Sequence, residues 1–237
     1  MPVRRLVIAG LALALCLTVS AQEPKDNPAV KPLNRDNARH KQFLKVVEKG
    51  AGDVIFLGDS ITQGWEGQKK TWDEAFGPFK PVNLGISGDQ TGHVLWRITE
   101  GKELDPIKPK LAVIMIGTNN MGGHSAEQIA GGVKAIVTEL QKQKPDMKIL
   151  LLGIFPRSAK ADDTIRKKVA ETNKIVATFV TKYADDKKVF YKDIGEKFLD
   201  KDGTLDKSIM PDLLHLSAEG YQIWADAIKD DIAKLVK

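Results

Sequence analysis

The stretch "VIFLGDSITQGW", residues 54–65, is the strongest indication of the fold of this chain. An apolar run ends on a glycine, and an acid and a serine follow before the sequence turns polar. A short continuous apolar run of this kind is typical of a strand buried on both faces of a parallel sheet. Ser60 at its end has two interpretations: it caps a following helix, a common task of serine after a strand, or it is a nucleophile.

Four more short apolar runs follow along the chain, and helical patterns separate them. Apolar residues recur at three- and four-residue steps in the segments between the runs, which are all too long for hairpins. This alternation predicts right-handed crossovers and an α/β fold, a three-layer α/β/α sandwich around a five-stranded parallel sheet. The further strands are expected at residues 81–85, 111–117, 148–154 and 188–194, and the helices at 35–50, 91–101, 125–143, 164–183 and from Ser217, the expected N-cap, to the end.

The N-terminal residues resemble an export signal. Arg4 and Arg5 precede an apolar stretch over residues 6–19, and small residues follow before Gln22. We therefore expect a signal peptide over residues 1–21 and a secreted or periplasmic protein. The apolar stretch is short for a bilayer span, so no stable membrane insertion of the mature chain is expected. Residues 22–34 are rich in Pro, Asn and Lys and predict a flexible leader, which leaves residues 35–237 as one folded domain.

Composition narrows the functional classes. Cys16, the single cysteine, lies in the predicted signal peptide after Leu15, where a lipid-attachment site normally has a small residue, so soluble export is favoured over a lipoprotein. The mature chain would then have no disulfide and no thiolate site. Without Arg4 and Arg5 the net charge of +5 falls to +3, and the charges are interspersed, so no nucleic-acid partner is expected. The spacing of histidines and carboxylates predicts no metal, and the glycine-rich loop lacks nucleotide patterns, so no cofactor is expected.

Polar residues follow the predicted strands directly, where ligands bind in parallel α/β sheets. The first strand leads into Gly58-Asp59-Ser60, the second into "GISGD" and the third into "GTNN". A last polar segment, "MPDLLHLS" at residues 210–217, precedes the final helix. We expect these segments to meet at one edge of the sheet.

Four of these segments carry a family resemblance. The blocks "GDSITQGW", "NLGISGDQT", "GTNN" and "DLLH" occur in the order and approximate spacing of the SGNH, or GDSL-type, hydrolases. From "GISGDQTGHVLWRI", "KPKLAVIMIGTNN" and "AEQIAGGVKAIV", the chain resembles the branch of the platelet-activating factor acetylhydrolase catalytic subunits. Ile61 stands where the named motif has leucine, which is a conservative change.

The resemblance implies an exported serine esterase with a flavodoxin-like sheet, acting on short acyl esters, acetyl above all, of a carbohydrate or other alcohol. It implies a Ser60, His215 and Asp212 triad, because a serine hydroxyl needs a base that an acid orients. It also implies that the N–H groups of Ser60 and Gly88 and the amide of Asn119 form the oxyanion hole. The alternatives are a lysophospholipase or thioesterase, or a non-catalytic carbohydrate- or lipid-binding module on the same fold.

Neighbouring polar residues have simpler interpretations. Asp59 is expected to bond loop backbone and to point away from Ser60. Asn119 could be a turn residue, but we expect Asn120 to have that role. Of the other histidines, we expect His40 on the solvated face of the first helix, His93 packed near the site without a direct role and His124 in a loop at the rim of the cleft.

Overall fold

The computed structural model describes residues 26–50, 52–181 and 188–237. Within them, five parallel strands form one sheet in the order β2-β1-β3-β4-β5, as the alternating pattern predicts. The last three strands end two residues earlier than predicted, because the chain turns away at the carboxyl edge of the sheet. The strands are β1 Val54–Gly58, β2 Pro81–Gly85, β3 Leu111–Met115, β4 Lys148–Leu152 and β5 Val189–Lys192.

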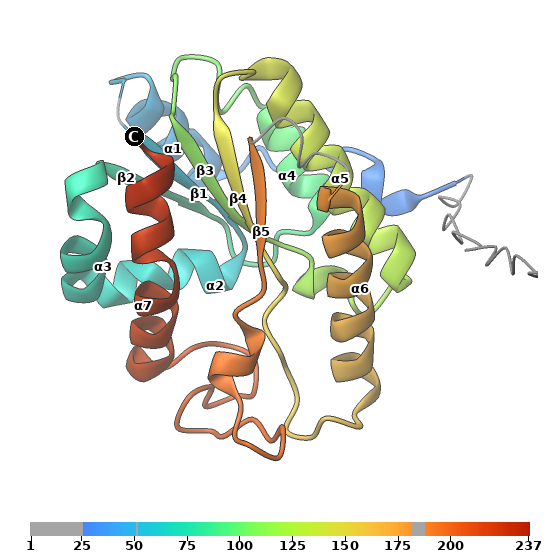
Figure 1. Cartoon of the computed structure of the whole chain (residues 1–237). Helices are drawn as coiled ribbons and strands as arrows, with labels where there is room; N and C mark the ends of the chain where they lie inside the picture. Colours follow the sequence, from blue (N-terminus) through green and yellow to red (C-terminus); the bar gives the residue numbers. More distant parts are fainter. Residues whose placement is uncertain (1–25, 51, 182–187) are drawn as a thin grey trace, which may run out of the picture.

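Helices cover both faces of the sheet, which gives the predicted three layers (Figure 1). One face packs against α1 Ala38–Val47, α4 Thr91–Ile98, α5 Ala126–Gln143 and α6 Thr164–Thr181. The other packs against α2 Ser60–Gln63, α3 Lys69–Phe76 and α7 Ala218–Leu235. The 3-10 turns are η1 Pro28–Val30, η2 Gly64–Gln68, η3 Gly77–Phe79, η4 Thr118–Asn120 and η6 Gly195–Phe198.

Two apolar cores result, because successive side chains of a strand point to opposite faces. In β1, Ile55 and Leu57 contribute to the core under α1, α4, α5 and α6, whereas Val54 and Phe56 contribute to the core under α7. All four are buried, which explains why the strand is a continuous apolar run instead of an alternating one. The sheet is thereby a rigid base for the loops at its carboxyl edge.

The expected leader is wrong for the part that the structure describes. Residues 26–34 run along the domain as an extended arm, with Ala29 buried in its 3-10 turn. The Thr91 hydroxyl donates to the carbonyl of Ala29 (2.8 Å), and the amide of Leu33 donates to the carbonyl of Gly92 (2.9 Å). An arm fastened by backbone hydrogen bonds needs no apolar periodicity, so the sequence gives no sign of it. The predicted signal peptide lies outside the described residues.

None of the helices in residues 26–50, 52–181 and 188–237 is both long and apolar enough to cross a bilayer.

Candidate active site

Ser60 is the first residue of α2, and only Asp59 separates it from the carboxyl end of β1. The cap of this helix is its neighbour: Asp59 is fully buried, and its Oδ1 accepts a hydrogen bond from the amide of Ile61 (3.0 Å). The expected backbone-bonding role of Asp59 is thus confirmed, and the helix-cap interpretation of Ser60 is wrong. The Ser60 hydroxyl instead lies 2.8 Å from Nε2 of His215.

His215 is held by Asp212 on the same loop. Its Nδ1 lies 2.6 Å from Oδ2 of Asp212, and the other carboxylate oxygen accepts the amides of Leu214 (3.1 Å) and His215 itself (2.7 Å). Burial opposes ionisation of Asp212, but the hydrogen bonds from His215 outweigh it and hold the pKa of this carboxyl below its usual value. A carboxylate at Nδ1 places the ring hydrogen there, which leaves Nε2 as the acceptor for the serine proton.

The loop between these two residues contains a strained residue that sequence reasoning missed. Leu213 has φ +61°, in the left-handed region that leucine rarely adopts. Two hydrogen bonds fix it: its amide donates to Met210 (2.8 Å), and its carbonyl accepts from Ser158 (3.0 Å). No apolar or charge pattern in the sequence signals such a conformation.

Aromatic side chains pack the start of α7 against α2 and the η2 turn that follows it. The ring of Trp65, just after α2, lies 4.7 Å from that of Tyr221 and 5.1 Å from that of Trp224. The Tyr221 hydroxyl donates to the carbonyl of Ile61 (2.7 Å). Since His215 precedes α7 by three residues, these contacts fix the distance between its loop and Ser60.

The glycine and asparagine of the predicted oxyanion hole lie on linked loops. Gly88 has φ +81°, a conformation that favours glycine. The Asn119 amide donates to the carbonyl of Asp89, the next residue, at 2.9 Å. Asn120 is buried and bonds Thr91 at the start of α4 through both side-chain atoms (3.1 and 3.2 Å), so it ties its turn to that helix.

A buried ion-pair network supports this region, and its arginines were not anticipated. Arg97 is fully buried and pairs with Asp89 (2.6 Å) and, through two nitrogens, with Glu103 (2.9 and 2.6 Å). Arg35 reaches the second oxygen of Asp89 at 2.6 Å. Burial works against the charge of Glu103, yet Arg97 keeps the pKa of this carboxyl below its usual value.

Two other histidines, His40 and His93, bond partners outside the predicted triad. His40 is only 2% exposed, so its expected place on a solvated face is wrong: it shares the core face of α1 with Phe43 and bonds Glu103 (3.0 Å) and the carbonyl of Gly101 (3.1 Å). His93 accepts the amide of Gln90 (2.9 Å) in the capping box of α4, and burial lowers the pKa of its ring.

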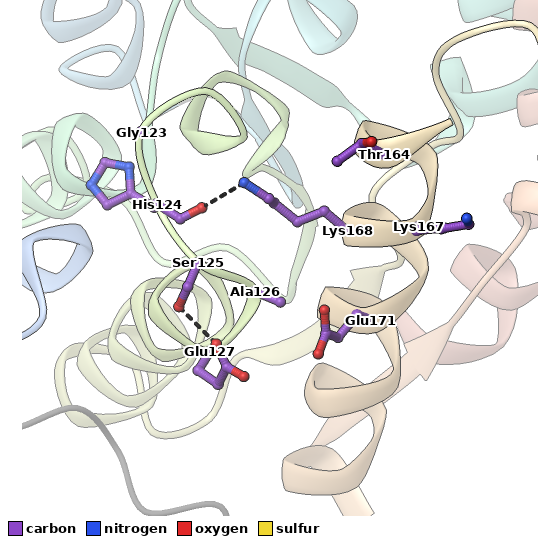
Figure 2. A pocket seen from close by; sticks show the side chains of 9 residues that line it. All are labelled: Gly123, His124, Ser125, Ala126, Glu127, Thr164, Lys167, Lys168 and Glu171. Atoms are coloured by element: carbon purple, nitrogen blue, oxygen red, sulfur yellow. Dashed lines mark hydrogen bonds between the residues drawn. The ribbon is translucent and has the colours of Figure 1, made fainter. Parts of the chain in front are cut away.

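Two hollows lie away from Ser60 and His215. One, of about 580 Å³, lies between the start of α5 and α6, and Figure 2 shows Lys168 reaching across from α6 to the carbonyl of His124 (3.1 Å). The second, of about 550 Å³, lies between α6 and the loop after β5.

Among the described residues, no group of three His, Cys, Asp or Glu side chains could hold a metal ion.

The matched family model decides the relationship. The model of the GDSL-like lipase/acylhydrolase family matches residues 56–223, a range that includes the residues of the predicted triad and oxyanion hole. This chain belongs to that family. The hydrolase is 37% identical over 203 residues to platelet-activating factor acetylhydrolase IB subunit alpha2 of Gallus gallus, covering 82% of this chain and 86% of the relative. The family and these relatives make it a carboxylic ester hydrolase, which sets aside the non-catalytic binding module.

Solved structures of low identity share the fold of this GDSL-family hydrolase. A GDSL-like lipase from Bacteroides thetaiotaomicron is 21% identical with a TM-score of 0.60, covering 82% of this chain and 97% of that one. An acetyl-xylooligosaccharide esterase from Geobacillus is 19% identical with a TM-score of 0.59, covering 76% and 93%. The predicted SGNH hydrolase fold is thereby confirmed.

Proposed function

We propose that this hydrolase is an exported serine esterase that cleaves short-chain acyl esters, acetyl esters above all, through a covalent acyl-enzyme on Ser60. One observation carries the proposal: the Ser60 hydroxyl lies 2.8 Å from Nε2 of His215, whose Nδ1 lies 2.6 Å from Asp212. A hydroxyl, an imidazole and a carboxylate in this sequence are the parts that make serine a nucleophile near neutral pH.

The geometry supports a two-step acyl transfer. As Ser60 attacks the ester carbonyl, Nε2 of His215 takes the hydroxyl proton, and Asp212 stabilises the imidazolium that forms. When the tetrahedral intermediate collapses, His215 returns the proton to the departing alcohol, and the acyl group stays on Ser60. Water then attacks the acyl-enzyme with His215 again as base, which releases the acid and restores the hydroxyl.

The charge that develops on the carbonyl oxygen would be met by three donors. They are the N–H groups of Ser60 and Gly88 and the side-chain amide of Asn119. Asn119 uses one amide hydrogen on the carbonyl of Asp89, and that bond fixes the plane of the amide while the second hydrogen stays available. Preorganised donors of this kind are effective because they need no rearrangement during the reaction.

The acyl preference rests on the relatives. The relatives at 37% identity are named as acetylhydrolases of platelet-activating factor, which favours an acetyl group on this chain as well. The leaving alcohol is then a deacetylated lipid, as the names of these relatives suggest, or a sugar hydroxyl, as the name of the acetyl-xylooligosaccharide esterase suggests. Export follows from the predicted signal peptide at residues 1–21.

A substrate series tests the proposal. We expect kcat/KM for nitrophenyl esters to be highest for acetate and to fall steadily toward octanoate, with Ser60→Ala inactive on all of them. An acetylated xylo-oligosaccharide and an acetyl-bearing phospholipid, assayed in parallel by acetate release, separate the two alcohol classes. Higher turnover of octanoate than of acetate would overturn the acetyl preference, and full activity in Ser60→Ala would overturn the mechanism.

A further inference from the structure

Arg35, the residue directly after the N-terminal arm, contacts the predicted oxyanion loop at residues 86–89. Arg35 lies outside residues 56–223, the stretch that the family model matches, yet its guanidinium contacts both neighbours of Gly88. Its Nη2 donates to the carbonyl of Ser87, and its Nε lies 2.6 Å from the buried carboxylate of Asp89. The Arg35 side chain itself is 24% exposed, so it covers the loop from the solvent side.

The contacted carbonyl belongs to the same peptide unit as the Gly88 N–H. A trans peptide is planar, and its C=O and N–H point in opposite directions. Whatever holds the Ser87 carbonyl toward Arg35 therefore directs the Gly88 N–H to the other side. A hydrogen bond from a cation also polarises the peptide, which makes its N–H a stronger donor.

The Ser87–Gly88 peptide can adopt either of two orientations. The amide of Asp89 donates to the carbonyl of Ile86 (3.1 Å), which closes a four-residue turn with Ser87 and Gly88 at its centre. The φ of +81° at Gly88 matches a type II turn, and type I differs from type II by rotation of the central peptide alone. Ser87 and Gly88 are both exposed, and glycine adopts either conformation readily, so core packing does not choose between them.

We propose that Arg35 is a positioning residue that keeps the Ser87–Gly88 peptide in the orientation in which the Gly88 N–H faces the reacting ester. The inference rests on the proposed function, since it assumes that this N–H stabilises the oxyanion. Two side chains hold the loop on either side of Gly88: Arg35 donates to the Ser87 carbonyl, and Asn119 donates to the carbonyl of Asp89 at 2.9 Å. Asp89 is fixed from behind by Arg97 (2.6 Å), so Arg35 pairs with a carboxylate that cannot follow it away.

A simpler interpretation is that Arg35 only fastens the arm. Loss of a fastening residue lowers stability or raises KM, whereas loss of an oxyanion donor lowers kcat with little change in KM. Arg39 provides a matched control, because it lies four residues further along the chain and binds a backbone carbonyl two peptides before that of Ser87. It donates to the carbonyl of Gly85 (2.7 Å) and pairs with Glu66 (2.8 Å), without contact to the Gly88 peptide.

The test compares Arg35→Ala, Arg35→Lys and Arg39→Ala in the full chain with nitrophenyl acetate. We expect kcat of Arg35→Ala to fall about 10- to 100-fold, less than the about 10²–10³-fold that removal of a whole donor costs, with KM within about twofold. Lysine offers one point charge instead of a fork, so Arg35→Lys should recover part of the loss. Arg39→Ala should keep kcat within about threefold of wild type, even where its melting temperature falls.

A second readout reports on the oxyanion hole itself. Sulfur is a weaker hydrogen-bond acceptor than oxygen, so a working hole should favour an ester over its thionoester. This preference should shrink in Arg35→Ala and stay unchanged in Arg39→Ala. If Arg35→Ala does not fold, Arg35→Lys carries both measurements.

The outcomes separate the two proposals. A kcat of the Arg35 variants within twofold of wild type, or an equal fall in Arg39→Ala, overturns the positioning role while Ser60→Ala stays inactive. An active Ser60→Ala would instead overturn the proposed function, whatever the Arg35 variants do.

Discussion

Asp59, the acid beside Ser60, should make the stability of this protein fall as pH rises. Burial raises the pKa of this carboxyl from 3.8 to about 7, and the charge of Asp89 adds to the effect, although the amide of Ile61 opposes it. Its Oδ2 is buried and has no hydrogen-bond partner among the residues that the structure describes. Ionisation in the folded state is therefore costly, and the protonated form is favoured.

The direction and the size of this pH effect on the free energy of unfolding follow from proton linkage. The folded pKa of about 7 exceeds the unfolded value of 3.8, so the folded state holds one more proton between these pH values. The contribution to the free energy of unfolding is fully present below about pH 4 and is lost as pH rises through about 7. At about 1.4 kcal/mol per pKa unit, about three units give an upper limit of about 4 kcal/mol.

Asp59→Asn isolates this contribution. Asparagine keeps the oxygen that caps α2 and does not titrate in this range. Between pH 5 and pH 8.5, urea unfolding should show the wild type losing about 3 kcal/mol relative to the variant. Parallel pH profiles, within about 0.5 kcal/mol, would contradict a raised pKa of Asp59, because a carboxyl that ionises normally in the folded state gives no such difference.

Other variants test neighbouring parts of the structure. Asn119→Ala should lower kcat about 10²–10³-fold with KM nearly unchanged, whereas Asn120→Ala, which loses two bonds to Thr91, should mainly lower the melting temperature; comparable kcat losses in both would contradict the separate roles. Arg97→Ala removes the shared arginine from two buried carboxylates, Asp89 and Glu103, and should cost about 3–5 kcal/mol in urea unfolding, while a loss under 1 kcal/mol would show that Arg35 and His40 are sufficient partners. The full chain expressed with an export pathway should yield a mature protein that begins at Gln22 by intact mass; an unprocessed N-terminus would contradict the signal peptide.

The sheet was predictable because its strands are short apolar runs that alternate with helical patterns. Burial on both faces makes β1 and β3 continuous in apolar residues, and the helices between the strands show the three- and four-residue period. The polar residues that follow the strands then had to meet at one edge. That rule predicted that Ser60, Gly88 and Asn119 would meet; in the structure Asn119 bonds Asp89, the neighbour of Gly88, and the final loop brings His215 to Ser60.

What the sequence could not reveal are contacts that have no period. Arg35 is 54 residues from Asp89, and the arm that precedes it binds through backbone atoms, which are the same in every residue. His40 looked solvated because it is polar, but it lies three residues before Phe43 on the core face, where Glu103 gives it a partner. Buried polar side chains depend on such distant partners, and residue spacing does not encode them.

Covalent labelling shows whether Ser60 is the nucleophile. The protein should react with a fluorophosphonate to give one adduct, which peptide mass spectrometry should place on Ser60, with loss of esterase activity in proportion to labelling. Ser60→Ala should take up no label, and His215→Ala should react far more slowly because the hydroxyl has lost its base. An active protein whose Ser60 stays unmodified, or an adduct at another residue that alone abolishes activity, would contradict the account.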